Sequence, residues 1–301
     1  MKRKIGRLWI ALLLIVLISG GAVLVASPSM RMRGYFRFCR AWQAHWPFAR
    51  GKYLPRRVSG VLRLVPVWVQ VEPGMTMLLD PYDSLGITVL TDGTYEPATV
   101  QELMRHVPAG GTFIDVGAHI GWYSLKAAKA VGPSGHVIAV EPNRETLTRL
   151  RDNIRASGVS SVVSVAPVAC ADSETTLTFY AASHRNTGES SLSAANASQE
   201  GAIAASYPVR ARRLDDIARE AGVNRVDAIK IDVEGAEFLV LRGAAEILDR
   251  YRPVVAVEVI DHQLRAMGAS ADELMAFMRS HGYAPKGIYD FNTVFVPVGA
   301  R

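Results

Sequence analysis

A short stretch around position 117 combines the residue types of a ligand-binding turn. Thr112–Val116 is an apolar run typical of a buried strand, with Asp115 near its end, and residues 122–130 have the composition of a helix. Gly117 and Gly121 lie between the two. A strand that turns sharply through glycines into a helix presents free backbone N–H groups and the positive end of the helix dipole. We therefore predict that this turn holds a small ligand.

The spacing of the glycines argues against a ligand that carries phosphate. A dinucleotide fingerprint needs G-x-G-x-x-G, so that the backbone can approach a pyrophosphate. Here the pattern is Asp115-x-Gly117-x-x-x-Gly121, which disfavours a dinucleotide oxidoreductase. An acidic strand end with only two glycines suits a ligand with a cationic amino-acid end and no phosphate, such as S-adenosylmethionine. The alternative is an ordinary turn between a strand and a helix, where glycine is common.

A second carboxylate lies at the end of the next predicted strand, His136–Val140. Glu141 follows that strand directly and stands 20 residues after Gly121, in the sequence Val140-Glu-Pro-Asn143. In dinucleotide-binding folds a carboxylate at this place accepts hydrogen bonds from the ribose hydroxyls. We predict that Glu141 binds a ribose, the alternative being a solvated glutamate in a loop.

Charged residues also interrupt the segment 227–237. Lys230 lies in the middle of an apolar strand that should be buried on both faces, and Asp232 shares its face by alternation. A buried lysine needs a partner or a task. Two interpretations stay open: a structural pair of lysine and carboxylate, or catalytic groups. Glu234 and Glu237 continue past the end of the strand.

Glu258 closes the next apolar run, residues 254–259. Adjacent parallel strands lie about 4.8 Å apart, so Asp232 and Glu258 should be neighbours if their strands pair. Carboxylates clustered there could bind the hydroxyls of a sugar, accept a proton or ligate a divalent cation. The His–Asp–Glu spacing of a dedicated metal site is not evident, and we assign no metal.

Strands and helices alternate around these candidate residues. Strands are predicted at 112–116, 136–140, 162–168, 228–231, 254–259 and 293–298, and helices at 122–130, 144–157, 214–221, 236–248 and 271–281. This order implies a parallel sheet with helices on both faces, and ligands in such folds sit beyond the carboxyl ends of the strands. The segment 182–205, rich in Ser, Ala, Asn and Gly, fits either disorder or an active-site lid.

The region before position 112 predicts a small β-rich lead-in. Residues 58–71, 75–79 and 86–90 read as short strands, with a turn at 81–86, and residues 99–106 read as a helix.

Composition excludes some classes of function. The chain has 301 residues, 49% of them hydrophobic and 21% charged, which is typical of a globular protein. Its net charge of +6 is concentrated near the N-terminus, where residues 27–71 hold nine Arg or Lys and no Asp or Glu. A membrane surface explains this charge better than a nucleic acid. Cys39 and Cys170 indicate neither a disulfide framework nor a metal site.

Residues 8–26 form an uncharged apolar run of 19 residues, long enough for a membrane-spanning helix. We predict an uncleaved anchor, and a cleaved signal peptide is the alternative. Arginines flank both sides of the run, so the positive-inside rule leaves its orientation open. In 32–52 four aromatics fall on one helical face opposite arginines, as in an interfacial helix or a stripe packed on the protein itself. These aromatics are Tyr35, Phe38, Trp42 and Trp46.

The motifs together resemble a known family, the FkbM-family S-adenosylmethionine-dependent methyltransferases. The resemblance covers about residues 75–298. It rests on Tyr95-Glu-Pro97, Phe113-Ile-Asp-Val-Gly-Ala-His-Ile-Gly121, Val140-Glu-Pro142, Gly188-Glu-Ser-Ser-Leu192, Leu214-Asp-Asp216, Ile229-Lys-Ile-Asp-Val-Glu-Gly-Ala-Glu237 and Leu241-Arg-Gly243. It implies a Rossmann-like class I methyltransferase fold, with a mostly parallel seven-stranded sheet whose last strand is antiparallel. It also implies methylation of an oxygen on a sugar, or on a sugar- or polyketide-derived metabolite.

The resemblance also implies roles for individual residues. The cofactor-binding candidates are Asp115, Gly117, His119, Gly121, Glu141 and Asn143. Beyond the resemblance, we hypothesise that Lys230, Asp232, Glu234 and Glu258 are catalytic. In this hypothesis Asp232 is the base or hydroxyl anchor, helped by Glu234 or Glu258, and Lys230 fixes the carboxylates. His119 departs from the Asn often found at its place in the family, and it keeps the ability to form hydrogen bonds.

These inferences give one expected organisation and activity. We expect a membrane anchor (1–27), a basic and aromatic juxtamembrane segment (28–57), a β-rich lead-in (58–111) and a methyltransferase domain (112–301). The acceptor would be a small molecule or a lipid-linked glycan. Because S-adenosylmethionine is cytosolic, the domain should lie on the cytoplasmic face of the inner membrane. A cofactor-binding module without turnover, or an enzyme of polyketide-type metabolism, stays open.

Overall fold

The computed structural model describes residues 65–183, 187–199 and 202–299. The chain divides into two compact units, one made of Met1–Val69 and Leu79–Gly93, the other of Gln70–Leu78 and Thr94–Arg301. The predicted anchor (8–26) and the juxtamembrane segment (28–57) lie outside the described residues. Within the described ranges, none of the helices combines the length and the apolar character that a membrane crossing requires.

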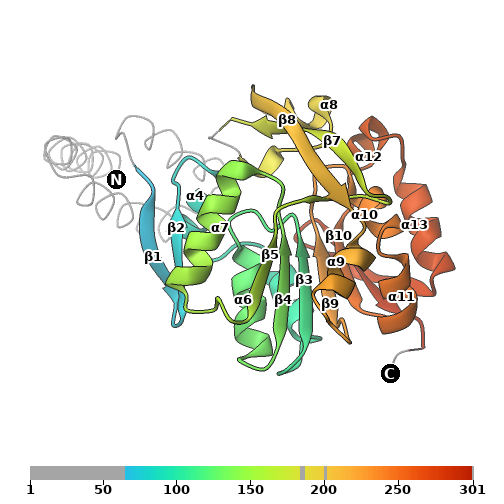
Figure 1. Cartoon of the computed structure of the whole chain (residues 1–301), viewed down its shortest axis with the longest axis horizontal. Helices are drawn as coiled ribbons and strands as arrows, with labels where there is room; N and C mark the ends of the chain where they lie inside the picture. The colour runs from blue at the N-terminus through green and yellow to red at the C-terminus, as the bar shows by residue number, and fades with distance from the viewer. Residues whose placement is uncertain (1–64, 184–186, 200–201, 300–301) are drawn as a thin grey trace, which may run out of the picture. The chain divides into compact units, whose positions relative to one another are not determined.

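A seven-stranded, mostly parallel sheet forms the centre of the larger unit (Figure 1). Its order is β11-β12-β10-β9-β3-β4-β5. Five neighbouring strands are parallel: β10 (Val254–Glu258), β9 (Ala228–Ile231), β3 (Thr112–Val116), β4 (His136–Val140) and β5 (Val163–Ala166). The last strand, β12 (Asn292–Pro297), is antiparallel to β10, which confirms the arrangement that the family resemblance implied. The edge strand β11 (Tyr283–Tyr289) was not predicted, and among the described residues it pairs with β12 alone.

The side chains of β3 show how the two faces of the sheet differ. Ile114 and Val116 point into one apolar cluster with residues of the helices that follow β8 and β9. Asp115 points to the other face, where Ser124 of α6 (Trp122–Val131) donates a hydrogen bond to it. Helices therefore pack on both faces, as predicted. The remaining helices of this unit are α5 (Pro97–Met104), α7 (Arg144–Ala156), α8 (Ala194–Ala197), α9 (Leu214–Glu220), α10 (Glu237–Arg242), α11 (Ala245–Tyr251), α12 (Asp261–Ala266) and α13 (Ala271–Ser280).

Two helix predictions need correction. Residues 236–248 form two helices, α10 and α11, because the helix is interrupted at Gly243. At this position a Cβ atom would lie 2.1 Å from the carbonyl oxygen of Ala171. The helix predicted at 99–106 begins two residues earlier, with Pro97 in its first turn. Proline suits that position because it lacks the N–H group that the first turn leaves unbonded.

The prediction of a strand at 86–90 was wrong, because these residues lie in the helix α4 (Ser84–Asp92). The side chain of Asp83 accepts hydrogen bonds from the backbone N–H groups of Leu85 and Gly86, which makes Asp83 an N-cap. Gly93 ends the helix with a φ of 77°. The lead-in therefore mixes helices with the strands β1 (Val67–Glu72) and β2 (Met75–Leu79), and a short apolar run cannot distinguish strand from helix.

The sequence analysis also missed a second sheet, inserted after β5. Its three strands, β6 (Ala169–Cys170), β8 (Ile203–Arg212) and β7 (Thr175–Ala182), pair in that order. Their apolar side chains, among them Phe179 and Val209, form a small core of their own. The described part of 182–205 holds the 3₁₀ turn η2 (Thr187–Glu189) and α8 between β7 and β8. This insertion is thus folded where it is described.

Candidate active site

The turn after β3 is shaped by the close approach of another loop. Gly117 has a φ of 83°, and a Cβ atom there would lie 1.8 Å from the carbonyl oxygen of Asp232. Gly121 has a φ of 94° at the start of α6, and its Cβ would lie 2.7 Å from Leu150. Both positions need glycine, for the backbone conformation and for the space. The predicted glycine turn is therefore also the place where β3 and the loop after β9 meet.

Asp115 lies beneath this turn and is buried from solvent. The hydroxyl of Ser124 donates to its Oδ2 over 2.6 Å. Burial raises the pKa of Asp115 to about 6, while the hydrogen bond from Ser124 and the charge of Lys230 oppose this rise. In this position the carboxylate ties β3 to the first turn of α6.

Glu141 organises the far side of the turn, at the end of β4. Its Oε2 accepts a hydrogen bond from the backbone N–H of His119 at 2.7 Å, and its Oε1 accepts one from the N–H of Asn143 at 2.8 Å. The side chain is buried, and burial raises its pKa. A carboxylate held in this way keeps further lone pairs for hydroxyl donors. The imidazole Nε2 of His119 lies 2.7 Å from Oγ1 of Thr187 in the insertion.

Asn143 is the N-cap of α7. Its Oδ1 accepts a hydrogen bond from the N–H of Glu145 at 3.0 Å, and its Nδ2 donates to Ser190 at 3.2 Å. The structure thus gives this cofactor-binding candidate a role in holding α7 and the insertion together.

A pocket opens between the glycine turn and the insertion. It contains about 540 Å³ of space free of atoms, a volume that includes open solvent. Among the predicted residues, Gly117, His119, Glu141 and Asp232 line it, whereas Asp115, Gly121 and Asn143 do not. Apolar side chains complete the lining: Val116, Val140 and Phe179 from the two sheets, and Leu192 from the segment between β7 and β8.

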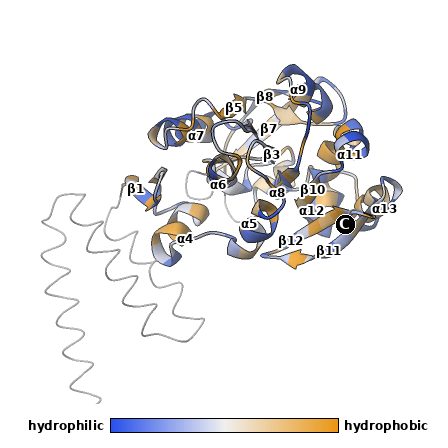
Figure 2. Ribbon diagram, turned by 90° about the horizontal axis from the view of Figure 1, so that it is seen from below, coloured by the Kyte–Doolittle hydropathy of each residue, from blue (hydrophilic) through white to orange (hydrophobic). Residues whose placement is uncertain are grey.

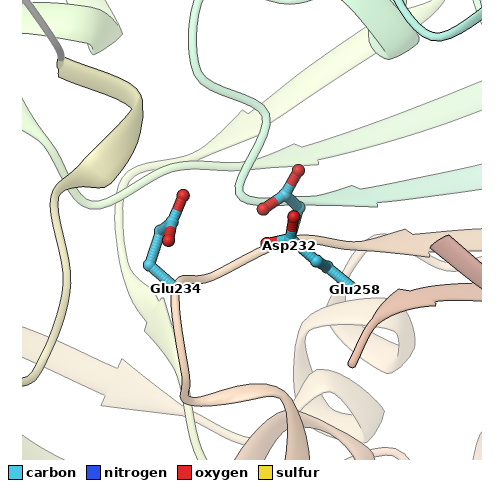
Figure 3. Close-up of side chains that lie close together, drawn as sticks. All are labelled: Asp232, Glu234 and Glu258. Carbon is cyan, nitrogen blue, oxygen red and sulfur yellow. The ribbon is translucent and has the colours of Figure 1, made fainter. Parts of the chain in front are cut away.

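Three carboxylates gather at the ends of β9 and β10 (Figure 3). Asp232 directly follows β9, Glu234 lies in the loop after it, and Glu258 ends β10. One oxygen of each carboxylate lies within 4.8 Å of the others. Burial, with the charge of Asp232 next, raises the pKa of Glu234 to about 8 and that of Glu258 to about 9. These carboxyl groups can hold protons at neutral pH, and in their ionised form the three could hold a divalent cation.

Lys230 is the positive charge beneath this carboxylate cluster. It is 1% exposed, and its Nζ donates to Oδ2 of Asp232 over 2.9 Å. The ammonium also lies 5.2 Å from the ring centre of Tyr123. Asp232 and Glu96 raise the pKa of Lys230 against the effect of burial, so the lysine stays charged. The predicted pairing of Lys230 with Asp232 and the proximity of Asp232 to Glu258 are both present.

Glu237 has a different role from the three carboxylates of the cluster. Its Oε1 accepts hydrogen bonds from the N–H groups of Val233 and Gly235, each at 3.1 Å, and burial raises its pKa to about 7. The loop that it holds is unusual, because Glu234 has a φ of 54° and Gly235 one of 104°. Glu237 is therefore a positioning residue, which keeps Glu234 on the cluster.

The insertion also holds this loop. Ser191 and Asn196 both donate to the carbonyl oxygen of Glu234, at 2.7 and 2.9 Å. Gln263 of α12 donates to the carboxylate of Glu234 at 2.8 Å. The segment from Thr187 to Asn196 therefore contacts the glycine turn at one end and the carboxylate loop at the other.

The sequence analysis missed three residues on the other side of Lys230. The hydroxyl of Tyr123 donates to Glu96 at 2.5 Å, and Nδ2 of Asn292 donates to the same carboxylate oxygen at 3.2 Å. Asn292 lies opposite Glu258 in the register of β12 and β10. The Tyr95-Glu-Pro97 motif was the available signal for Glu96, but nothing in the sequence linked it to Asn292.

Fold and site together define an α/β protein of the Rossmann-like class, with a ligand pocket next to a cluster of carboxylates. The chain belongs to the FkbM methyltransferase family, since the family model described as Methyltransferase FkbM domain matches residues 115–285, more than half of its length. The matched region is therefore a methyltransferase domain, and the resemblance implies S-adenosylmethionine as its methyl donor.

Two curated relatives match parts of the chain. The AMB antimetabolite synthetase AmbE of Pseudomonas aeruginosa is 29% identical over 228 residues, which is 64% of this chain and 10% of that protein. Methyltransferase 1 of Beauveria bassiana is 28% identical over 151 residues, 45% of this chain and 59% of that protein. The chain thus spans about a tenth of the first relative and about three fifths of the second.

Among solved structures, Methyltransferase FkbM from Methylobacillus flagellatus KT is similar over 88% of this chain and 58% of its own, with 16% identity and a TM-score of 0.44. At this identity and TM-score the structural likeness adds nothing to the family assignment.

Proposed function

We propose that this methyltransferase acts on a hydroxyl group of a sugar, glycan or glycolipid-type acceptor at a membrane. The observation that carries the proposal is the cluster of Asp232, Glu234 and Glu258 beside the pocket, with Lys230 beneath it. Neighbouring carboxyl groups in mixed protonation states can both accept and donate hydrogen bonds, and this suits an acceptor with several adjacent hydroxyls.

The residues of the pocket fit S-adenosylmethionine as the cofactor. A buried carboxylate, Glu141, is fixed by two backbone N–H groups and can accept the hydroxyls of a ribose. Gly117 leaves the backbone of the turn open, and the apolar lining from Val116, Val140 and Leu192 suits an adenine ring. Bound S-adenosylmethionine supplies a methyl group on a sulfonium, which a nucleophile can take directly.

Asp232 is the group that we propose to orient and deprotonate the acceptor hydroxyl. It lines the pocket and is 29% exposed at its side chain, so a ligand can reach it, while Lys230 fixes its Oδ2. A carboxylate within about 3 Å of a hydroxyl can take its proton during or after transfer. Glu234 and Glu258, which can carry protons at neutral pH, anchor neighbouring hydroxyls of the same acceptor. Positioning of this kind can contribute several kcal/mol to lowering the barrier.

A membrane-tethered enzyme on the cytoplasmic face of the inner membrane completes the proposal. It is supported by the apolar run 8–26, by the basic segment that follows it and by the cytosolic supply of S-adenosylmethionine.

The test uses membranes that contain the full chain, incubated with methyl-labelled S-adenosylmethionine. We expect label in a glycan or glycolipid fraction that strong acid hydrolysis converts to labelled O-methyl sugar. Membranes with Asp232→Asn provide the control for background transfer. Label that enters only protein, or none that depends on Asp232, would contradict the proposed acceptor.

A second acceptor class is favoured by one comparison. The relative from Pseudomonas aeruginosa is named an antimetabolite synthetase, which suits a methyltransferase of secondary metabolism, including one for polyketide-type products. Label that appears in a small, soluble, organic-extractable product would support this alternative. If S-adenosylmethionine stabilises the protein to heat but no fraction becomes labelled, a cofactor-binding module without turnover is supported instead.

A further inference from the structure

The hairpin of β11 and β12 ends in a turn that exposes two large apolar side chains. Ile288 is 76% exposed and Phe291 is 83% exposed. Tyr289 pairs with Asn292, so Asp290 and Phe291 are the two residues of the turn. Isolated exposed apolar residues are common on proteins, but two of this size at one hairpin end are worth a physical account.

The backbone of the turn is strained in order to carry Phe291. Asp290 has a φ of 43° and Phe291 a φ of 75°, which is the geometry of a type I′ turn. Asp tolerates this region, and Gly is favoured in the second position, but a bulky aromatic residue there is an outlier. The side chain of Phe291 contributes little packing because it is so exposed. Strain that the fold does not need points to a function of the side chain.

The turn is rigidly attached to the rest of the unit. Oδ2 of Asp290 accepts hydrogen bonds from the N–H groups of Ala98 and Thr99 at 2.7 and 2.9 Å, and thereby caps α5. Thr99 donates in turn to the carbonyl oxygen of Tyr289 at 2.6 Å. Figure 2 shows α5 next to the β11–β12 hairpin. The tip therefore presents its apolar side chains from a fixed support.

The tip also lies at the site end of the sheet. Asn292, the residue after the turn, pairs with Glu258 of the carboxylate cluster, and it donates to Glu96 at 3.2 Å. A surface that binds the tip therefore lies at the same end of the sheet as the acceptor carboxylates.

Pairing with the edge strand of a second copy does not suit this hairpin. β11 carries Pro285, which lacks an N–H donor, and its register shifts between Pro285 and Gly287. Both features block the addition of a further strand at an edge.

We propose that Ile288 and Phe291 insert into the surface of a lipid bilayer and turn the acceptor side of the site toward it. The same chain brings a bilayer close, through the predicted span 8–26 and a following segment with nine basic and no acidic residues up to position 71. Aromatic and aliphatic side chains at a rigid tip are suited to the boundary between headgroups and acyl chains. The inference rests on the proposed function, because it names where that acceptor is met.

The test places a probe at the tip of the full chain in proteoliposomes of phosphatidylcholine and phosphatidylglycerol. In a Cys39→Ser background the remaining Cys170 is buried, so Phe291→Cys can be labelled selectively with an environment-sensitive fluorophore. Val298→Cys is the matched control, since Val298 is apolar, 63% exposed and lies at the other end of β12.

We expect spin-labelled lipid to quench the probe at 291, and soluble iodide to quench it several-fold less than the probe at 298. A probe at 291 that iodide reaches as freely as the one at 298 would overturn the proposal. A probe shielded from iodide but not quenched by spin-labelled lipid would also overturn it, because protein then covers the tip: the N-terminal segment or a second copy. The quenching does not depend on methyl transfer. A protein that lacks the proposed activity can therefore still show insertion of the tip, and an active protein can lack it.

Discussion

Lys230 and Asp232 form the pair on which the proposed chemistry depends. The lysine is fully buried in the middle of the sheet, and a charge in that place is stable only because Asp232 and Glu96 lie on either side of it. The ammonium therefore does two things: it holds the Asp232 carboxylate in one orientation, and its charge opposes the repulsion that raises the pKa of Glu258.

Replacement of Asp232 by Asn should separate catalysis from cofactor binding. The amide keeps the shape of the side chain but is a far weaker base, so we expect turnover to fall by about 10²- to 10⁴-fold. Affinity for S-adenosylmethionine, measured by calorimetry, should stay within a factor of about two. Full turnover in this variant would show that Asp232 is neither the base nor the hydroxyl anchor.

The pH dependence of stability should report the carboxylate cluster. The pKa values of Glu234 and Glu258 are raised to about 8 and about 9 in the folded state, so the folded protein binds protons that the unfolded chain releases above about pH 4.5. Stability from these groups is therefore full below that pH and is lost as pH rises toward 9, by at most about 1.4 kcal/mol per unit for each proton.

The measurement is the free energy of unfolding between pH 5 and pH 9. Glu258→Gln should flatten the decline and leave the variant more stable than wild type near pH 9. An equally steep decline in the variant would mean that Glu258 is ionised in the folded protein throughout this range.

Gly117→Ala tests the contact between the glycine turn and the carboxylate loop. The new Cβ would lie 1.8 Å from the carbonyl oxygen of Asp232, so backbone must move, and we expect a loss of about 3 kcal/mol or more. Gly93→Ala is the control, because Gly93 also has a positive φ, 77° in the left-handed region, but nothing within 4 Å of the new atom. The control should lose only about 1 kcal/mol in denaturant unfolding. Equal losses would mean that the positive φ alone, and not the contact with the carbonyl oxygen of Asp232, requires glycine at position 117.

At the scale of elements, the strained backbone at Phe291 in the turn of the β11–β12 hairpin lowers the stability of the fold. Glycine adopts a φ near 75° without the strain that phenylalanine carries, so Phe291→Gly should stabilise the fold by about 1 kcal/mol. Thermal unfolding of the full chain in detergent would show this as a rise in Tm. A drop in Tm would indicate that Phe291 packs and is not held under strain.

The elements also show what the sequence can and cannot predict. Four of the parallel strands were predictable because each is a mostly apolar run that ends at or just before a glycine or a carboxylate. Gly117 follows Thr112–Val116, and Asp232 follows Ala228–Ile231. The run at 86–90 was misassigned because so short a run with few apolar residues fits either period, and the deciding signal was the cap at Asp83. The insertion strands were missed because most of their outward residues are small or polar.

The residues of the candidate site also divide into those that could be predicted from the sequence and those that could not. Candidates on one strand end or in one motif, such as Asp232 and Glu258, could be brought together by the rule for adjacent strands. The contact of Asn292 with Glu96 could not, because it joins residues 196 positions apart through the antiparallel return of β12. Hydrogen bonds from the insertion to Glu234 depend on tertiary packing in the same way.

At the scale of the whole molecule, the proposed location makes a prediction of its own. If the domain is cytoplasmic and tethered by residues 8–26, protease added outside intact cells should leave it uncut, and the same protease should digest it after lysis. Removal of residues 1–27 should release the methyltransferase into the soluble fraction with S-adenosylmethionine binding retained. Digestion in intact cells would reverse the orientation, and retention of the truncated chain on membranes would mean that other parts bind them.

The segment from Thr187 to Asn196 has a thermodynamic consequence for the order of ligand binding. It reaches His119 on the cofactor side through Thr187, and it holds the carbonyl of Glu234 on the acceptor side through Ser191 and Asn196. Because one segment contacts both sides, the two binding events are coupled. A bound cofactor that orders the segment should reduce the conformational entropy that the protein loses when the acceptor binds. Linkage makes this effect reciprocal: whatever factor the cofactor adds to acceptor affinity, the acceptor adds to cofactor affinity.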